Sequence, residues 1–179
     1  LTGLADTLIM LGLHYGSEEG RRRGAELMAA ICHTAYRSSI ELAREGADVC
    51  LTYRKHEAEA ERYAEEIRGL GRKALALKCD ISSFAEAEGV IQKALEAFGH
   101  VDILVNNAGM NWDGVSWKMT EEQWDRVISV NLKGYFNFVR KVAPMMKDSK
   151  YGKIINITSI NGLRGKKGQT NYSASKAGM

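Results

Sequence analysis

The chain has 179 residues, of which 45% are hydrophobic and 26% charged, and its formal net charge is +3 at pH 7. This length is enough for one domain with a hydrophobic core, and the composition is that of an ordinary globular protein. The charge is too small to indicate nucleic-acid binding, and no apolar run reaches the roughly 20 residues of a membrane span. Cys32, Cys50 and Cys79 lack metal-ligand spacing, so we expect no metal site but small buried thiols in a reducing compartment, the cytoplasm.

Residues 1–46 are predicted to form a helical hairpin. Apolar residues between Leu4 and Leu11 indicate a short helix, which His14-Tyr15-Gly16 ends. Ser17-Glu18-Glu19 supplies an N-cap and acidic residues that favour the first turn of the next helix. The apolar spacing beyond it favours one long helix ending at Gly46.

Residues 47–179 alternate between strand and helix patterns, which predicts a parallel, doubly wound α/β domain. The predicted strands are 48–53, 73–79, 101–105 and 154–157. The predicted helices are 54–70, 84–98, about 120–146 and one that starts near Tyr172. Residues 161–170 are expected to form a loop.

The side chains that could carry chemistry collect between residues 152 and 179. Tyr172 and Lys176 are four residues apart, so a helix places them on one face. A phenol has a pKa near ~10, and a neighbouring ammonium lowers that pKa. The pair therefore predicts a proton donor for general acid catalysis. Ser159 follows a strand, at the edge where parallel sheets bind ligands.

Four segments, in order and in register, resemble the short-chain dehydrogenase/reductase family. Ser159, Tyr172 and Lys176 match its Ser…Tyr-x-x-x-Lys pattern. Asn106-Asn107-Ala108-Gly109 and Val130-Asn131-Leu132-Lys133-Gly134 match two further segments of that family. The resemblance implies a Rossmann-type fold and the reduction of a carbonyl compound.

The resemblance covers about residues 41–179 and is closest to the 3-oxoacyl-carrier-protein reductase branch. It implies that Tyr172 donates a proton to a substrate carbonyl, and that Lys176 lowers the pKa of that tyrosine and holds a ribose. It also implies that Ser159 hydrogen-bonds the carbonyl oxygen and that Asn131 anchors a relay water. The alternative is that these residues are inherited in a protein that no longer reacts.

The resemblance also implies NADP as the cofactor. An Arg at position 54, after the first predicted strand, suits a 2′-phosphate, whereas the alternative is a solvated side chain. Asp80 resembles an adenine-contacting acid, and its alternative role is to cap the next helix. The full cofactor-binding set implied in this way is Arg54, Asp80, Asn107, Ala108, Gly109, Tyr172 and Lys176.

Residues 1–42 depart from that family. Its glycine-rich phosphate loop should fall at residues 28–35, which contain no glycine. A continuous helix there offers a pyrophosphate no free N–H groups, because all of them bond internally. This segment instead resembles a helix pair from vitamin-B12-dependent ribonucleotide reductases, which indicates a chimera.

Several expectations follow from this departure. The hairpin replaces the first strand–helix unit of the family, whose last strands would lie beyond Met179. The four strands are then expected to pair in the flavodoxin-like order 2-1-3-4, unless a second copy fills the gap.

We expect one compact unit, with residues 1–46 packed on a Rossmann-type domain over 47–179. We expect this unit to self-associate and to bind neither nucleic acid nor membrane. The chain is expected to be an inactive reductase, with residual NADP-dependent ketoreductase activity or nucleotide binding without catalysis as alternatives.

Overall fold

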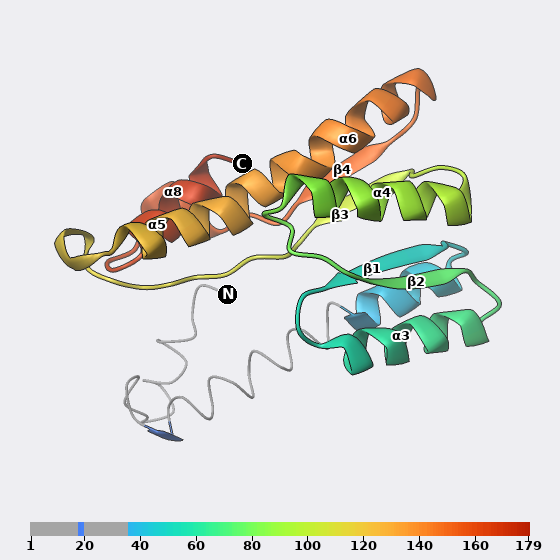
Figure 1. Cartoon of the computed structure of the whole chain (residues 1–179), viewed down its shortest axis with the longest axis horizontal. Coiled ribbons are helices and arrows are strands. Elements are labelled where there is room, and N and C mark those ends of the chain that lie inside the picture. The colour runs from blue at the N-terminus through green and yellow to red at the C-terminus, as the bar shows by residue number, and fades with distance from the viewer. Residues whose placement is uncertain (1–17, 20–35) are drawn as a thin grey trace. The chain divides into compact units, whose positions relative to one another are not determined.

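The computed structural model of the protein describes residues 18–19 and 36–179 (Figure 1). Of these, residues 36–49 and 58–74 group into one compact unit, and residues 50–57 and 75–179 into a second. Most of the predicted hairpin, and the whole of 28–35, where the phosphate loop of the resembled family would fall, lie outside the described residues. Both the hairpin and the domain boundary at residue 46 therefore stay predictions.

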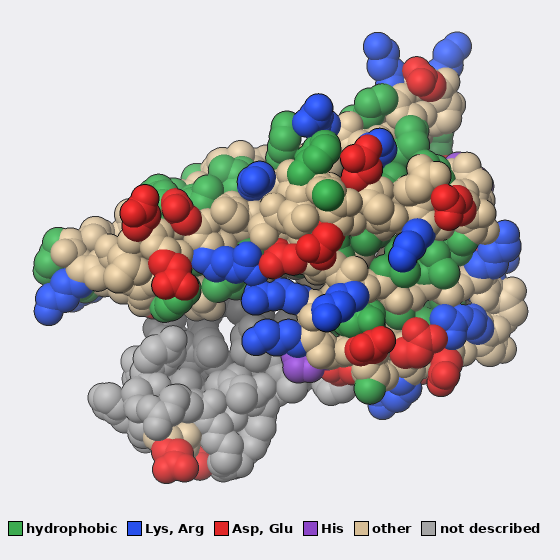
Figure 2. All heavy atoms as spheres, viewed as in Figure 1, with side chains coloured by type: hydrophobic (Ala, Val, Ile, Leu, Met, Phe, Trp, Pro, Cys, Tyr) green, Lys and Arg blue, Asp and Glu red, His purple; other side chains and the backbone are tan. Residues whose placement is uncertain are grey.

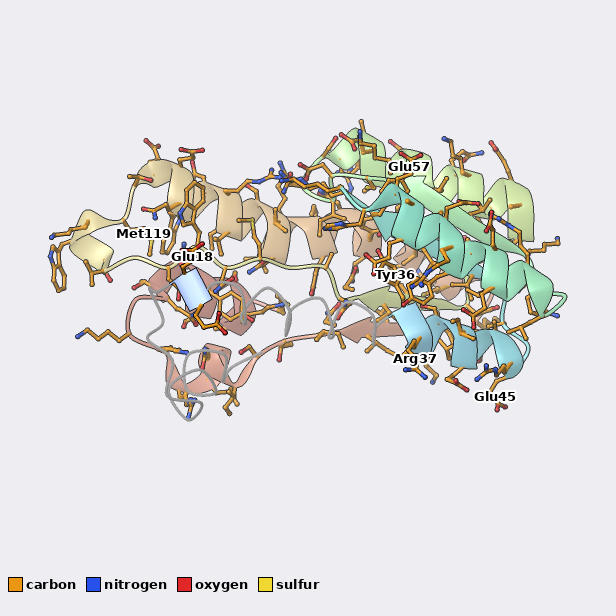
Figure 3. The ribbon with its side chains drawn as sticks, turned by 90° about the horizontal axis from the view of Figure 1, so that it is seen from below. Glu18, Tyr36, Arg37, Glu45, Glu57 and Met119 are labelled. Atoms are coloured by element: carbon orange, nitrogen blue, oxygen red, sulfur yellow. The ribbon has the colours of Figure 1, made fainter. Side chains whose placement is uncertain are left out.

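The first unit contains the end of the N-terminal helix. Residues 36–44 are helical, and Gly46 follows with a φ of 101°, a left-handed conformation typical of a glycine at a helix C-terminus. The predicted helix end is thus confirmed. Tyr36, in the first described turn (Figure 3), stacks on Tyr63 of helix α3 (Glu57–Gly69) with ring centroids 4.9 Å apart.

The strands form two parallel pairs. β1 (Val49–Tyr53) pairs with β2 (Ala74–Lys78), and β3 (Ile103–Asn106) pairs with β4 (Lys153–Asn156). Hydrogen bonds from Val49 N to Lys73 O and from Cys79 N to Tyr53 O show that β1 and β2 run in the same direction. Four parallel strands alternating with helices confirm the α/β class.

The predicted single sheet of order 2-1-3-4 is not formed by the described strands. β1 and β3 do not pair, so the strands divide into 2-1 and 3-4. The physical reason lies in the shared core, because helix α4 packs against Cys50 of β1 and Leu104 of β3 together. Paired strands lie only about 4.8 Å apart, so joining β1 to β3 in one sheet would require this core to repack.

Two long helices supply most of the core of the second unit. α4 (Phe84–Phe98) and α6 (Gly134–Asp148) lie side by side (Figure 1). Ser83 caps α4 by accepting a hydrogen bond from Glu86 N, and Gly99, at a φ of 85°, ends it. The predicted bounds 84–98 are confirmed. The buried core residues are Cys79, Ala87, Val90, Ile91, Phe138, Val142 and Met146.

The β3–β4 pair is packed mainly on one face. Successive side chains of a strand point to opposite faces, and Leu104 joins the core. On the other face Ile103 is 47% exposed, and Val105 and Ile155 are each 46% exposed. This face is apolar and open to solvent.

The helix predicted over 120–146 is divided by a π-helical turn. α5 (Glu121–Ile128) begins at a capping box formed by Thr120 and Gln123. The π-helical segment η2 (Ser129–Lys133) follows, and α6 continues from it. Such turns widen a helix locally and are frequent at functional sites. Asn131 lies at the centre of this one.

The last part of the chain contains one helix more than predicted. α7 (Ile160–Arg164) occupies part of the expected loop, and the 3₁₀ turn η1 (Ser116–Lys118) precedes α5. α8 (Thr170–Ala177) confirms the helix predicted to start near Tyr172.

The surface charges are mixed. Acidic and basic side chains of the described residues are interspersed on the face shown in Figure 2, in keeping with the small net charge. Within the described part of the chain, no helix combines the length and the apolarity needed to cross a membrane.

Candidate functional site

Helix α8 places Tyr172 and Lys176 on one face, as predicted. The Lys176 Nζ lies 5.9 Å from the centre of the Tyr172 ring. Lys176 is buried and Tyr172 is half-buried. The hydrogen bonds of Tyr172 to the described residues run through its backbone N–H and C=O. Its hydroxyl makes no hydrogen bond to any described residue.

The Lys176 ammonium is held by groups from two other elements. It donates hydrogen bonds to Ile157 O, just after β4, at 2.7 Å and to the hydroxyl of Tyr135 in α6 at 3.3 Å. Burial lowers the pKa of Lys176 to about 8. The residue therefore changes charge close to neutral pH, which is unusual for a lysine.

Tyr135 is a site residue that the sequence reasoning missed. It is 3% exposed, and its ring centroid lies 5.1 Å from the Lys176 Nζ. Its hydroxyl donates to Ile157 O at 3.3 Å. Burial, followed by repulsion from Tyr172, raises the pKa of Tyr135 well above its usual range. The sequence contained a hint of this role, because Tyr135 follows the predicted site residue Asn131 by four residues and therefore lies near it on the helix surface.

The side-chain amide of Asn131 connects two segments of the chain by hydrogen bonds. Its side chain is fully buried, and its Nδ2 donates to Met110 O at 2.8 Å and to Ser175 Oγ at 3.0 Å. Its Oδ1 accepts from Met110 N at 2.8 Å. The amide thus joins the segment after β3 to α8. The predicted anchoring of a relay water by Asn131 stays a prediction.

Ser159 lies on the neighbouring helix rather than in contact with Tyr172. Its Oγ caps α7 by accepting a hydrogen bond from Asn161 N at 3.2 Å, which leaves its hydroxyl proton free to donate. α7 and α8 approach closely, because a Cβ added to Gly162 would lie 2.7 Å from the carbonyl carbon of Lys176. The structure thus brings the serine and the lysine to adjacent helices without a hydrogen bond between them.

A buried amide, also missed from the sequence, holds the start of α8. Asn171 is fully buried, and its Nδ2 donates to Trp112 O at 3.0 Å and to Gln123 O at 2.9 Å. Its Oδ1 accepts from Tyr172 N at 2.8 Å. Because Asn171 directly precedes Tyr172, these bonds determine where the tyrosine stands.

Two of the predicted cofactor-binding residues, Arg54 and Asp80, lie in a charged cluster at the ends of β1 and β2. Arg126 of α5 donates to the Asp80 carboxylate at 2.7 Å, and Arg54 Nε lies 4.0 Å from the same oxygen. Ser82 donates to the other oxygen through its N–H and its hydroxyl. Burial opposes ionisation of Asp80, but the hydrogen bonds from Ser82 and Arg126 outweigh it and lower the pKa to about 2.

This cluster changes the expected roles of Asp80 and Arg54. The N-cap of α4 is Ser83, so Asp80 does not cap that helix. Both carboxylate oxygens of Asp80 already accept hydrogen bonds, which leaves little capacity for an adenine amine. The Arg54 side chain is 52% exposed, and its N–H groups can reach an anion from solvent. The arrangement therefore fits a phosphate better than it fits a base.

The segment Asn107-Ala108-Gly109 is exposed and passes over the buried lysine. A Cβ added to Gly109 would lie 3.3 Å from Asn131 Oδ1 and 3.7 Å from Lys176 Nζ. Glycine therefore lets the backbone lie close to both polar groups. The family resemblance implies that Asn107, Ala108 and Gly109 line the adenosine side of a cofactor, and this placement stays a prediction.

Comparison with known proteins shows which family the chain belongs to. Residues 35–179 match the family model described as short chain dehydrogenase. The 3-oxoacyl-[acyl-carrier-protein] reductase FabG of Staphylococcus epidermidis is 42% identical over 141 residues, which cover 79% of this chain and 58% of that relative. The FabG protein of Staphylococcus aureus is 39% identical over 141 residues, which cover 79% of this chain and 57% of the relative.

Nodulation protein G of Azospirillum brasilense is 41% identical over 138 residues, which cover 77% of this chain and 56% of that protein. The chain thus spans less than 60% of the length of each of these relatives. The matched region begins at residue 35 and contains every predicted site residue. This chain belongs to the short-chain dehydrogenase family.

Proposed function

We propose that this chain carries the proton-donating side of an NADP-dependent carbonyl reductase whose substrate is an oxoacyl thioester. The observation that carries the proposal is the Tyr172 hydroxyl, which is half-buried and left to meet a ligand, beside the ammonium of buried Lys176. The substrate class follows the names of the reductases from Staphylococcus.

The side chains of this site have separate tasks. Tyr172 donates a proton to the substrate oxygen, and the positive charge of Lys176 stabilises the phenolate that remains. Ser159 uses its free hydroxyl proton to orient the same oxygen. Asn131 and Asn171 keep the two ends of the proton donor's helix in place, since catalysis is sensitive to displacements on the order of 1 Å.

NADP, when bound, supplies the hydride in such a reaction. Of the chain's own residues, Arg54 would face the 2′-phosphate, since its guanidinium is exposed and lies at the end of β1. Asn107, Ala108 and Gly109 would lie beneath the ribose, with Lys176 below them. The close approach of Gly109 to Lys176 supports this placement.

A second candidate is a nucleotide-binding module that does not turn over. Residues 28–35 contain no glycine, and the family match starts only at residue 35. Both observations favour an origin outside the family for the first 34 residues, and hence a chimera that lacks a phosphate loop. Its resemblance to ribonucleotide reductase stays part of this hypothesis.

Fluorescence titration with NADPH, followed by an NADPH-oxidation assay with a 3-oxoacyl thioester, separates these candidates. Binding with turnover that Tyr172→Phe abolishes supports the reductase. Binding without turnover at high protein concentration supports the nucleotide-binding module. Lack of binding to NADPH and to its adenosine half would contradict both candidates.

Self-association belongs to the same proposal. The apolar face formed by Ile103, Val105 and Ile155 is open to solvent, and an exposed strand edge is a ready template for another chain. A second copy could fill the gap between β1 and β3. Sedimentation equilibrium tests this idea, and a strictly monomeric protein at high concentration would reject it.

A further inference from the structure

We propose that Tyr135 is a positioning residue of this site, whose hydroxyl holds the Lys176 ammonium beneath the reactive phenol of Tyr172. The inference rests on the proposed reductase function, because it assigns Tyr135 a task in presenting the lysine to the proton donor. Neither the family pattern nor the sequence reasoning includes this residue.

The first argument is the arrangement of three polar atoms. The Lys176 Nζ donates to Ile157 O at 2.7 Å and to Tyr135 Oη at 3.3 Å, while that hydroxyl donates to the same carbonyl at 3.3 Å. The phenol therefore accepts from the ammonium and gives its own proton to the backbone. This triangle joins α8, α6 and the end of β4 around one nitrogen.

The second argument is the difference between the two phenols near that nitrogen. Tyr135 is 3% exposed, and its proton is committed to Ile157 O, so it serves as a neutral acceptor and not as an acid. Tyr172 is half-buried, and its hydroxyl makes no hydrogen bond to a described residue. The two phenols thus differ in role: Tyr135 positions the ammonium, and Tyr172 is the one that can react with a substrate.

The third argument concerns compensation for burial. Lys176 is 6% exposed, and none of the ion pairs among the described residues joins a carboxylate to it. The groups that face its ammonium are Ile157 O and the two phenols, from the end of β4, α6 and α8. A buried ammonium without a counter-ion depends on neutral acceptors and aromatic faces for its stabilisation.

Tyr135→Phe tests this assignment, because it removes the hydroxyl and keeps the ring. An acceptor stabilises the charged form of an amine, so its loss lowers the pKa of Lys176. A hydrogen bond of about 1 kcal/mol corresponds to a downward shift of roughly half to one pH unit. Tyr151→Phe is the matched control, because Tyr151 is 55% exposed and the hydrogen bonds of the Lys176 ammonium to the described residues go to Tyr135 and Ile157.

The measurement is the pH titration of the Lys176 side chain by NMR in lysine labelled with carbon-13, with the signal assigned by its loss in Lys176→Met. We expect a lower midpoint in Tyr135→Phe and an unchanged midpoint in Tyr151→Phe. An unchanged or higher midpoint in Tyr135→Phe would overturn the proposal.

The readout is independent of turnover. If the wild-type chain fails to oxidise NADPH while the Tyr135→Phe midpoint shifts, the proposed reductase function fails and the Tyr135–Lys176 link stands. If the wild-type chain turns over, Tyr135→Phe should move the alkaline limb of the kcat profile downward by the same amount and leave KM for the keto substrate unchanged. If the alkaline limb of the kcat profile does not move in Tyr135→Phe, Tyr135 has no role in the reaction.

Discussion

The two ends of the candidate site differ in how their polar groups are held. Around α8, Asn131 and Asn171 are fully buried and Lys176 is 6% exposed, and each makes two or more hydrogen bonds to other segments. At the ends of β1 and β2, the side chains of Arg54 and Asp80 are 52% and 29% exposed, and Asp80 accepts its hydrogen bonds from the partly buried Ser82 and Arg126.

This difference in burial shows for which end of the site the folded core determines the positions of the side chains. A buried polar group that loses its partner pays a desolvation penalty of about 1–3 kcal/mol, whereas an exposed ion pair contributes only about 0–1 kcal/mol. The end that donates the proton is therefore part of the folded core, and its geometry persists as long as the core does. At the end that would bind the nucleotide, substitutions should affect folding less than at the end that donates the proton.

The largest effect is expected for Asn171→Ala. The substitution removes a fully buried amide that donates to the partly buried carbonyls of Trp112 and Gln123, so we expect a loss of about 2–4 kcal/mol in the free energy of unfolding. Asn111→Ala is the matched control, because Asn111 is exposed and should change stability by less than about 0.5 kcal/mol. Urea unfolding measures both, and equal losses would contradict the contrast between the two ends.

Lys176→Met should raise stability at pH 7. Burial lowers the pKa of Lys176 from 10.5 to about 8, so between these values the unfolded chain binds more protons and stability rises with pH. Below pH 8 the full penalty of the buried charge applies, on the order of 1–3 kcal/mol. Methionine removes this penalty, and Ile157 O keeps its bond from Tyr135.

The gain from Lys176→Met should become small near pH 10.5, where the amine is neutral in the native state and only half protonated in the unfolded state. Unfolding in urea at pH 7 and at pH 10.5 measures it. A variant less stable than wild type at pH 7 would show that the lysine's hydrogen bonds outweigh its desolvation. Such a trade of stability for a functional group is common at active sites.

A smaller effect is expected for Arg126→Ala. Asp80 has its pKa lowered to about 2 through hydrogen bonds from Ser82 and Arg126, so its contribution is present above the unfolded pKa near ~4 and is lost as pH falls through 2. Removing Arg126 should reduce stability at pH 7 by about 1–2 kcal/mol and have little effect at pH 2. Urea unfolding at the two pH values tests this, and an equal loss at both would point to packing instead.

The smallest effect on folding is expected for Arg54→Ala. Its Nε lies 4.0 Å from Asp80, and its side chain is 52% exposed, so we expect a change below about 0.5 kcal/mol. If Arg54 faces a 2′-phosphate, the same substitution should weaken binding of 2′,5′-ADP at least tenfold and leave binding of 5′-AMP unchanged. Calorimetry with both ligands measures these affinities. If the substitution weakens the binding of both ligands equally, Arg54 does not recognise the 2′-phosphate.

Part of the site was readable from local spacing. The four-residue interval between Tyr172 and Lys176 is sufficient to place them on one face of a helix, and α8 confirms it. The Ser…Tyr-x-x-x-Lys pattern led to the family that residues 35–179 match. The contacts of Tyr135 with Lys176, of Asn171 with Trp112 and of Arg126 with Asp80 were not readable, because they join residues that are distant in sequence.

The sequence by itself determined those elements whose signals are local. Period, caps and terminal glycines lie within a few residues of one another, and so Ser83 and Gly99 bound α4 as predicted. Tertiary structure alone decided that the strands form two pairs, that a π-helical turn divides the long helix at Asn131, and that Tyr135 meets Lys176. These features depend on how α4 and α6 share one core, and therefore on contacts that no local pattern of residues encodes.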